Sequence, residues 1–537
     1  MLDLGLSRRG LMGGAAALLA ASAARAQGSG AQGSGAPGQV VETTEGRYRG
    51  REENGVQVFR GMRYGADTSG TGRFMPPRPP ERFAGVREAY EFGDQAPQPR
   101  TILTVPGPIS EDCLRVNVWT PQVGGAAKRP VMLWFHGGGF EAGTGSSGLY
   151  DGGAMARRGD VVIVTINHRL NVFGFCDLSG LLGPQFAQSG NVGYLDLVAA
   201  MRWVRANIAA FGGDPGNVTI YGQSGGGRKV SVCFAGTEAK GLFHKGIVQS
   251  GSHLRVHTPQ EARALTDALL KKLEIAPADA RKLQEVPAEL LGARQREVIA
   301  AAGYRFEPVL DGISFKAHPW VPNAPQQTAR VPLMLGTTQT ELSNQLGRDP
   351  AIFEMDEAGL KARLARTLPA DAADEAVRVF RASTPSGSAA EMYFKIASWR
   401  AYITNATTMA EQRHAQNGAA NPTWMYQVTW RSPVQGGRRF SEHTIDLPFM
   451  FDNVDKAPHL TGPQTEQTRA MTEAMAGAWL AFARNGDPNH AGLPRWPTYD
   501  TARRPVMLFD VPPTLANDPF REERLFMARF PPVRGGS

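Results

Sequence analysis

One serine lies in a sequence pattern typical of an activated nucleophile. Ser224 is the centre of the pentapeptide Gly222–Gly226, which reads G-x-S-x-G and follows the β-branched and aromatic run of residues 218–221. In this pattern the serine occupies a sharp turn between a strand and a helix, so its hydroxyl projects from the backbone. Glycine is needed on both sides because larger side chains would collide with the neighbouring strand and helix. We therefore predict nucleophilic chemistry at Ser224.

A serine hydroxyl needs a base that takes its proton and a third group that orients the base. In hydrolases with this turn the order along the chain is Ser, then Asp or Glu, then His. His443 is the favoured base because a polar loop runs there directly into an apolar segment. Two carboxylates qualify as the orienting group. Glu341 lies just past a predicted strand, where α/β sheets place functional groups, whereas Asp311 precedes a glycine, a pairing typical of a turn.

A developing negative charge on a carbonyl oxygen also needs hydrogen-bond donors. Gly137, Gly138 and Gly139 directly follow a predicted strand that ends in Phe135-His136. Glycine there lets backbone N–H groups approach a substrate oxygen closely. The N–H group of Gly225, the residue after the serine, is expected to be a further donor. These glycines predict an oxyanion hole.

The elements around these residues predict an α/β fold. Between residues 130 and 255, apolar strands alternate with helical segments, and the runs 131–135 and 161–166 are apolar at nearly every position. Such runs are typical of strands covered on both faces. The alternation indicates a mostly parallel central sheet flanked by helices. Residues 260–300 and 355–415 have helical composition, and we expect them to be insertions packed over the active site.

The beginning of the chain is typical of an export signal. Arg8 and Arg9 form a twin arginine, a short apolar run follows, and residues 24–26 have the A-x-A form of a signal-peptidase site. We predict a twin-arginine signal peptide over residues 1–26, cleaved near Ala26; the alternatives are an ordinary Sec signal or a flexible start. The mature protein is then expected to be periplasmic or secreted.

The repeated segment after the signal predicts a flexible tether over residues 27–39, rich in glycine, serine and glutamine. A single domain is expected from residue 40 to residue 537.

The net charge of +8 comes without a dense Lys/Arg cluster, so no nucleic-acid groove is predicted. No segment has the composition of a stable membrane span, and the sequence carries no signal for an oligomeric state.

The chain has three cysteines, Cys113, Cys176 and Cys233, so at most one disulfide can form. We expect all three to be buried and free. No cluster of histidines and cysteines suggests a metal site. No zinc site is therefore expected.

With these motifs in order, the chain resembles the type-B carboxylesterase/cholinesterase family of the α/β-hydrolase superfamily. The resemblance runs from about residue 40 to residue 510. The matching segments are Phe59–Tyr64, Ser110–Leu114, Asn117–Trp119, His136–Phe140, Asn167–Leu170, Gly222–Gly226, Gln249–Ser252, Gly336–Glu341, His443–Phe449 and Gly486–Asn489.

The resemblance implies hydrolysis of a small carboxylic ester through an acyl-serine intermediate, without metal or cofactor. It also favours Glu341 over Asp311. One alternative is a catalytically silent cholinesterase-like binding protein, and another is the same machinery acting on carbamates or amides. The implied site consists of the nucleophile Ser224, the acid Glu341, the base His443 and the oxyanion donors Gly138, Gly139 and Gly225.

Several positions depart from the family pattern, among them Leu342 for glycine after Glu341 and His168 for tyrosine. Gln223 stands where the family usually has glutamate, which removes a negative charge beside the serine. Gly225 replaces the usual alanine and is expected to loosen the oxyanion hole slightly. Thr340 replaces an aspartate beside Glu341. The family's partner cysteine for Cys113 is missing, so that disulfide is expected to be lost.

Overall fold

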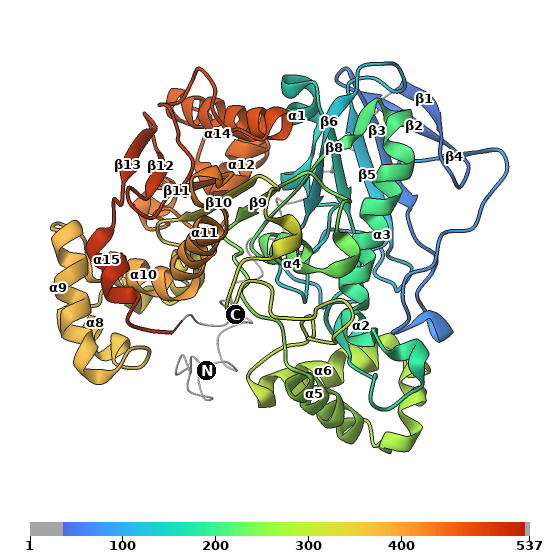
Figure 1. Ribbon diagram of the computed structural model, residues 1–537, viewed down its shortest axis with the longest axis horizontal. Coiled ribbons are helices and arrows are strands. Elements are labelled where there is room, and N and C mark those ends of the chain that lie inside the picture. Colours follow the sequence, from blue (N-terminus) through green and yellow to red (C-terminus); the bar gives the residue numbers. More distant parts are fainter. Residues whose placement is uncertain (1–35, 532–537) are drawn as a thin grey trace, which may run out of the picture.

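The computed structural model describes residues 36–531 and is built around one large twisted sheet (Figure 1). Twelve of its strands follow one another in hydrogen-bonded order, and β4 (Val86–Glu88) pairs with β2 beside that path. The order across the sheet is β1 (Ala36–Glu42), β2 (Arg47–Glu53), β3 (Val56–Arg63), β5 (Arg115–Thr120), β7 (Val162–Ile166), β6 (Arg129–Phe135), β8 (Gly213–Gln223), β9 (Lys245–Gln249), β10 (Leu333–Thr338), β11 (Thr423–Val428), β12 (Pro505–Phe509) and β13 (Thr514–Asn517).

The centre of the sheet is parallel and both of its edges are antiparallel. From β7 through β12 every neighbouring pair is parallel, as the alternation of strands and helices predicts. The strands β1, β2, β3 and β5 pair antiparallel with one another and with β7, and β13 pairs antiparallel with β12. The sheet is therefore mixed, with its parallel part under the candidate site.

Each central strand contributes to two hydrophobic cores, one on either face of the sheet. Along β6, Val131, Leu133 and Phe135 belong to one core, whereas Met132 and Trp134 belong to the other. Side chains alternate across a strand, so a strand that is apolar at every position is covered on both faces. The helices α3 (Val192–Asn207) and α4 (Gly225–Ala235) contribute to the first core, and α12 (Asp446–Met450) and α14 (Glu466–Asn485) to the second.

The two segments expected to be helical insertions are helical. The first contains α5 (Pro259–Lys272) and α6 (Ala288–Ala302). The second contains α8 (Glu357–Leu364), α9 (Ala373–Ser383), α10 (Ala389–Ser398) and α11 (Thr404–Asn417), with a short π-helical turn at Trp399–Ile403. The helices α8 to α10 share a third hydrophobic core with α15 (Arg521–Met527) and form the lobe at the left of Figure 1.

The folded chain begins earlier than the sequence predicts. Strand β1 starts at Ala36, inside the predicted tether of residues 27–39, and Ala36 and Pro37 pair with β2 before a bulge precedes Val40. This strand is mostly exposed. Without an alternating apolar pattern it carries no sequence signal for a strand. The predicted signal peptide, residues 1–26, lies outside the described residues.

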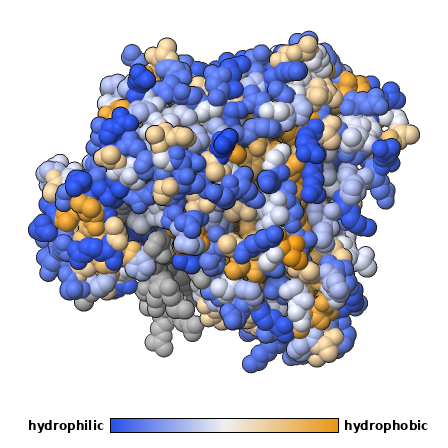
Figure 2. Space-filling model, viewed as in Figure 1, coloured by the Kyte–Doolittle hydropathy of each residue, from blue (hydrophilic) through white to orange (hydrophobic). Residues whose placement is uncertain are grey.

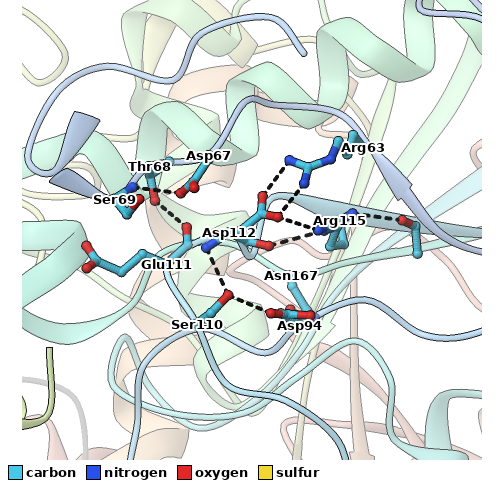
Figure 3. Close-up of polar contacts among 11 residues, drawn as sticks. Arg63, Asp67, Thr68, Ser69, Asp94, Ser110, Glu111, Asp112, Arg115 and Asn167 are labelled. Atoms are coloured by element: carbon cyan, nitrogen blue, oxygen red, sulfur yellow. Dashed lines mark hydrogen bonds and ion pairs between the residues drawn. The ribbon is translucent and has the colours of Figure 1, made fainter. Parts of the chain in front are cut away.

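A polar cluster joins three segments of the chain on the side of the sheet near β5 (Figure 3). At its centre the Asp112 carboxylate accepts hydrogen bonds from Arg63 and Arg115. The Asp112 amide donates to the Ser110 hydroxyl, which in turn donates to Asp94. Arg63 and Arg115 face each other at the paired ends of β3 and β5, and these contacts attach the loop segments of Asp94 and Ser110 to that end of the sheet.

The loop that follows β7 is fixed by buried polar side chains. Asn167 accepts hydrogen bonds from the Thr144 hydroxyl and the Gly145 amide, and it donates to the carbonyl oxygen of Asp94. Two residues later, Arg169 forms an ion pair with Asp196 at 2.6 Å, and both side chains are almost completely buried. Breaking such a buried pair on one side typically costs about 3–5 kcal/mol. The N-x-R motif therefore anchors the segment that supports the glycine loop after β6.

The cysteine prediction is confirmed, since Cys113, Cys176 and Cys233 are all free and buried. Burial raises the pKa of the Cys176 thiol to about 12, so this thiol is protonated at neutral pH.

Hydrophilic side chains cover most of the face seen in Figure 2, and hydrophobic ones gather in a strip at the middle of the view. Between residues 36 and 531, no helix has the length and apolar composition that a bilayer span requires.

Candidate functional site

The turn at Ser224 has a strained backbone. Ser224 lies between β8 and α4 with φ 57° and ψ −122°, a conformation that side chains disfavour. A Cβ atom on Gly226 would lie 1.9 Å from the carbonyl oxygen of Phe135, and one on Gly222 would lie 2.5 Å from the carbonyl carbon of Gly226. The strand and the helix therefore touch backbone to backbone, which explains the requirement for glycine on both sides of the serine.

Gln249, at the end of β9, supports this turn in two ways. Its carbonyl oxygen accepts a hydrogen bond of 2.8 Å from the Ser224 amide. Its side-chain amide donates to the Asp446 carboxyl at 2.7 Å and accepts from the Trp479 indole at 3.1 Å. Gln249 thus joins the serine turn to α12, which begins three residues after His443.

The structure brings together two of the predicted side chains directly. The Nδ1 atom of His443 lies 2.5 Å from Oε2 of Glu341, and the other carboxylate oxygen of Glu341 accepts a hydrogen bond of 2.8 Å from the Thr338 amide. The carboxylate can only accept at that contact, so Nδ1 carries the hydrogen. The second ring nitrogen, Nε2, is buried and has no hydrogen-bond partner among the described residues. Nε2 is therefore the nitrogen open to another group.

A reciprocal contact joins the loops that carry Glu341 and His443. The Thr340 hydroxyl donates to the carbonyl oxygen of Ser441 and accepts from its amide, both at 2.9 Å. The Thr340 amide donates to the same carbonyl at 3.2 Å. An ionised aspartate has no hydrogen to donate, so it could not make the first of these bonds. This contact gives Thr340 a structural role where the family usually has aspartate.

Gln223 connects the serine turn to the histidine. Its side-chain amide nitrogen donates a hydrogen bond of 2.5 Å to the carbonyl oxygen of His443. Gln223 is buried, and an ionised glutamate at this position would place a carboxylate oxygen against that carbonyl instead. Glutamine at this position therefore stabilises the backbone of His443 where it lies, and an ionised glutamate would repel it.

Asp446 is a buried carboxyl beside the Glu341–His443 pair. Burial chiefly, together with the charge of Glu341, raises the pKa of Asp446 to about 7, although the bond from Gln249 opposes this shift. One of its carboxyl oxygens has no hydrogen-bond partner in the part of the chain that the structure describes. Below about pH 7 the Asp446 carboxyl is therefore mostly neutral.

The rival carboxylate, Asp311, stabilises a turn. Its Oδ1 atom accepts hydrogen bonds from the Ile313 amide at 2.9 Å and the Phe315 amide at 3.0 Å, and Oδ2 accepts from Asn191 at 2.8 Å. These are the contacts expected of an aspartate that precedes a glycine in a turn. Of the two candidate carboxylates, Glu341 contacts His443, whereas the contacts given for Asp311 are those of a turn residue.

The predicted oxyanion glycines are brought together by close backbone packing. Gly138 and Gly139 have φ angles of +92° and +64°, which favour glycine. A Cβ atom on Gly225 would lie 2.2 Å from the amide nitrogen of Gly139. Gly225 therefore packs tightly against the loop, contrary to the expectation that it loosens the hole. The loop is held further along by Gln98, whose side chain exchanges hydrogen bonds of 2.6 and 2.8 Å with the Gly143 backbone.

A group of charged side chains that we did not predict from the sequence lies near the serine turn and the glycine loop. Arg228, one helical turn after Ser224, lies 3.8 Å from Glu307, which is also 3.8 Å from His253. Burial alone would raise the pKa of Glu307, but the positive charges of His253 and its neighbours outweigh that effect and lower it. Arg305 pairs with Glu141, close to the glycine loop, at 2.6 Å. The partners are far apart in the chain, so no short motif marks them.

Tyr402, in the π-helical turn of the second insertion, contacts the histidine. The centroids of its ring and the His443 ring are 4.9 Å apart. Burial chiefly raises the pKa of Tyr402 to about 12, so the phenol is neutral at physiological pH. The second insertion therefore reaches the candidate site, as the sequence predicts.

Comparisons with known proteins identify the family of the chain. The model of the carboxylesterase family matches residues 37–527. The para-nitrobenzyl esterase of Bacillus subtilis (strain 168) is 35% identical over 498 residues, which cover 90% of this chain and 98% of the relative. The phenmedipham hydrolase of Pseudarthrobacter oxydans is 32% identical over 478 residues, which cover 86% of this chain and 92% of the relative.

Solved structures give the same result. The crystal structure of a carboxylesterase from Geobacillus stearothermophilus superimposes with a TM-score of 0.78 at 37% identity, covering 91% of this chain and 99% of the other. The family model and the structural match both span about nine tenths of the chain or more, so the likeness concerns the family as well as the fold. The chain belongs to the carboxylesterase family, has the α/β-hydrolase fold and is a carboxylic-ester hydrolase.

Proposed function

We propose that this protein is an exported serine carboxylesterase that hydrolyses small esters through an acyl-serine intermediate. In this proposal Ser224 is the nucleophile, His443 is the general base and acid, and Glu341 orients the histidine. The observation that carries it is the 2.5 Å contact between His443 and the buried Glu341 carboxylate. Gln223 supports it, because this residue ties the backbone of His443 to the turn that exposes the serine.

Acylation begins when Nε2 of His443 takes the hydroxyl proton of Ser224 and the serine oxygen attacks the ester carbonyl carbon. The carbonyl oxygen becomes negatively charged and accepts hydrogen bonds from the N–H groups of Gly138, Gly139 and Gly225. Each such donor typically contributes on the order of 3 kcal/mol to transition-state stabilisation. When the tetrahedral species collapses, the bond to the alcohol oxygen breaks, and His443 returns its proton to the leaving alcohol.

Deacylation repeats these steps with water as the nucleophile. His443 takes a proton from water, the hydroxide attacks the acyl carbon, and the bond to Ser224 breaks as the serine oxygen regains a proton. Glu341 fixes the hydrogen on Nδ1 in both halves of the reaction and stabilises the imidazolium that forms twice. The products are a carboxylic acid and an alcohol.

The nucleophile is tested by the substitution Ser224→Ala. Without the hydroxyl no acyl-serine can form, so we expect turnover of a nitrophenyl acyl ester to fall by at least about 10⁴-fold. The measurement is nitrophenolate release, with circular dichroism and thermal unfolding as the control for folding. Activity near that of the wild type would exclude Ser224 as the nucleophile.

The two carboxylates are tested as a matched pair. Glu341→Gln removes the charge that orients His443 and is expected to lower kcat by about 10³-fold or more. Asp311→Asn keeps the size of a turn residue, so we expect it to lower the unfolding temperature while kcat stays within about threefold. The measurements are kcat and the unfolding temperature of both variants. A large loss of kcat in Asp311→Asn with little loss in Glu341→Gln would make Asp311 the orienting carboxylate.

Gln223 is tested by comparing two substitutions. Gln223→Met removes the hydrogen bond to His443, and Gln223→Glu also places a negative charge against its carbonyl oxygen. We expect kcat to fall about fivefold for methionine and about thirtyfold for glutamate, which corresponds to roughly 1 and 2 kcal/mol. If glutamate supports wild-type kcat, the hydrogen bond of Gln223 does not position the histidine.

Export is tested in cells that express the full chain. The proposal rests on the twin arginine, the apolar run and the A-x-A site within residues 1–26. We expect esterase activity outside the cytoplasm, with a new N-terminus near residue 27. Lysine at both Arg8 and Arg9 should retain the precursor inside, because the twin-arginine signal is lost. Export of that double variant at the wild-type level would point to the general secretory route.

A further inference from the structure

Lys229 is a completely buried basic residue beneath the candidate site. It lies on α4, five residues after Ser224, and its side chain is 0% exposed (Figure 1 shows α4 against the sheet). Its Nζ atom donates a hydrogen bond of 2.8 Å to the carbonyl oxygen of His136. Among residues 36–531 no carboxylate pairs with it, and burial, followed by the charge of Arg228, lowers the pKa of Lys229 well below its ordinary value.

Such a residue is costly to place. A buried amine without a counter-ion loses its hydration, and a methionine of similar length would avoid that cost. A role in folding alone therefore gives no reason for a lysine here. The hydrogen bond to His136 is its distinguishing contact.

The acceptor of that bond stands at the start of the oxyanion loop. His136 immediately precedes Gly137, and its Nδ1 atom lies 2.8 Å from the Gly137 carbonyl oxygen. That oxygen can only accept, so Nδ1 carries the hydrogen. The carbonyl of Gly137 belongs to the peptide group that bears the N–H of Gly138. Two hydrogen bonds thus hold the first two peptide groups of the loop, one from Lys229 and one from the His136 ring.

A second histidine completes the cluster. The rings of His136 and His168 are stacked, with centroids 5.0 Å apart and planes 20° from parallel. The Nδ1 atom of His168 contacts the Arg169 carbonyl at 2.8 Å, and the Nε2 atoms of both histidines have no hydrogen-bond partner among the described residues. Burial chiefly lowers the pKa of both rings well below the usual histidine value. The pair is therefore neutral and keeps His136 in one orientation.

The backbone of α4 packs directly against the backbone at the start of the oxyanion loop. A Cβ atom on Gly226 would lie 1.9 Å from the Phe135 carbonyl oxygen and 3.2 Å from that of His136. A displacement of Lys229 is therefore transmitted to the loop through backbone contacts as well as through its own hydrogen bond.

We propose that Lys229 is a positioning residue of the oxyanion loop, which holds the His136–Gly137 peptide so that the N–H groups of Gly138 and Gly139 meet the developing oxyanion. The amine donates this hydrogen bond whether it is charged or neutral. The inference rests on the function proposed above. It adds a group that touches neither the substrate nor the triad.

The test is the substitution Lys229→Met, which keeps the length of the side chain and removes the donor. We expect kcat for a nitrophenyl acyl ester to fall at least about tenfold while KM changes less than about twofold, since the loop acts on the oxyanion and not on substrate binding. A trifluoromethyl ketone, which adds to the serine and forms an oxyanion, should lose affinity by a similar factor. The product alcohol, which forms none, should bind as it does to the wild type.

Cys233→Ala is the matched control, because Cys233 lies one turn further along the same helix and is also 0% exposed. We expect it to lower thermal stability and leave both kcat and ketone affinity within about twofold. Equal losses of ketone affinity in the two variants would reduce Lys229 to a packing residue and overturn the proposal. So would a loss confined to KM, or a loss of kcat with unchanged ketone affinity.

If Lys229→Met does not fold, Lys229→Gln is measured in the same way. Its amide retains a donor, so it should keep more ketone affinity than any donor-free variant of equal stability, such as Lys229→Leu. A glutamine variant no better than leucine would contradict the proposal. A wild-type protein that hydrolyses no ester would instead refute the proposed function, whereas an active wild type with an equally active Lys229→Met variant refutes only the role of Lys229.

Discussion

The site depends on the backbone conformation of Ser224. A non-glycine residue with φ 57° and ψ −122° persists only where its surroundings determine it fully. Here they do so because β8, α4 and the end of β6 meet through glycines, with no side chain between them. The hydrogen bond from the Ser224 amide to Gln249 then fixes the turn against β9. The strained turn is thus held by backbone contacts with β6, β9 and the glycine loop.

Buried polar contacts connect the candidate catalytic residues to that turn. Gln223 donates to His443, Gln249 donates to Asp446, and Thr340 joins the loops that carry Glu341 and His443. A buried polar group without a partner is costly, so each of these contacts also favours one arrangement of the loops. The departures of Gln223 and Thr340 from the family pattern are therefore coupled to the local hydrogen bonding of this chain.

The sequence predicted the parts that depend on local chemistry. The apolar runs of β6 and β7 and the glycine-rich turn at Ser224 follow from side-chain type and spacing, and the structure contains them where they were expected. The edge strand β1 was missed because its residues are exposed and its pairing with β2 is set by long-range contacts. Residues alone left Glu341 and Asp311 as alternatives, because the contact between Glu341 and His443 spans 102 residues of chain.

The features that sequence reasoning missed share one property. Lys229 contacts His136, and Arg228 contacts Glu307. The fold brings these partners together from distant parts of the chain, so no short motif contains both members of either pair. Gly225 illustrates the same limit in reverse: its lack of a side chain was read as looseness, whereas the backbone of Gly139 occupies that space. Close packing between distant segments is what a single sequence conveys least.

The central claim is that catalysis passes through a covalent bond to Ser224. The most direct measurement is to quench the enzyme with acid during turnover of a nitrophenyl acyl ester and to map the peptides by mass spectrometry. The account predicts one added acyl group on the peptide that contains Ser224, which disappears as the substrate is exhausted. Turnover without any acylated Ser224 peptide, or with the acyl group on another residue, would contradict it.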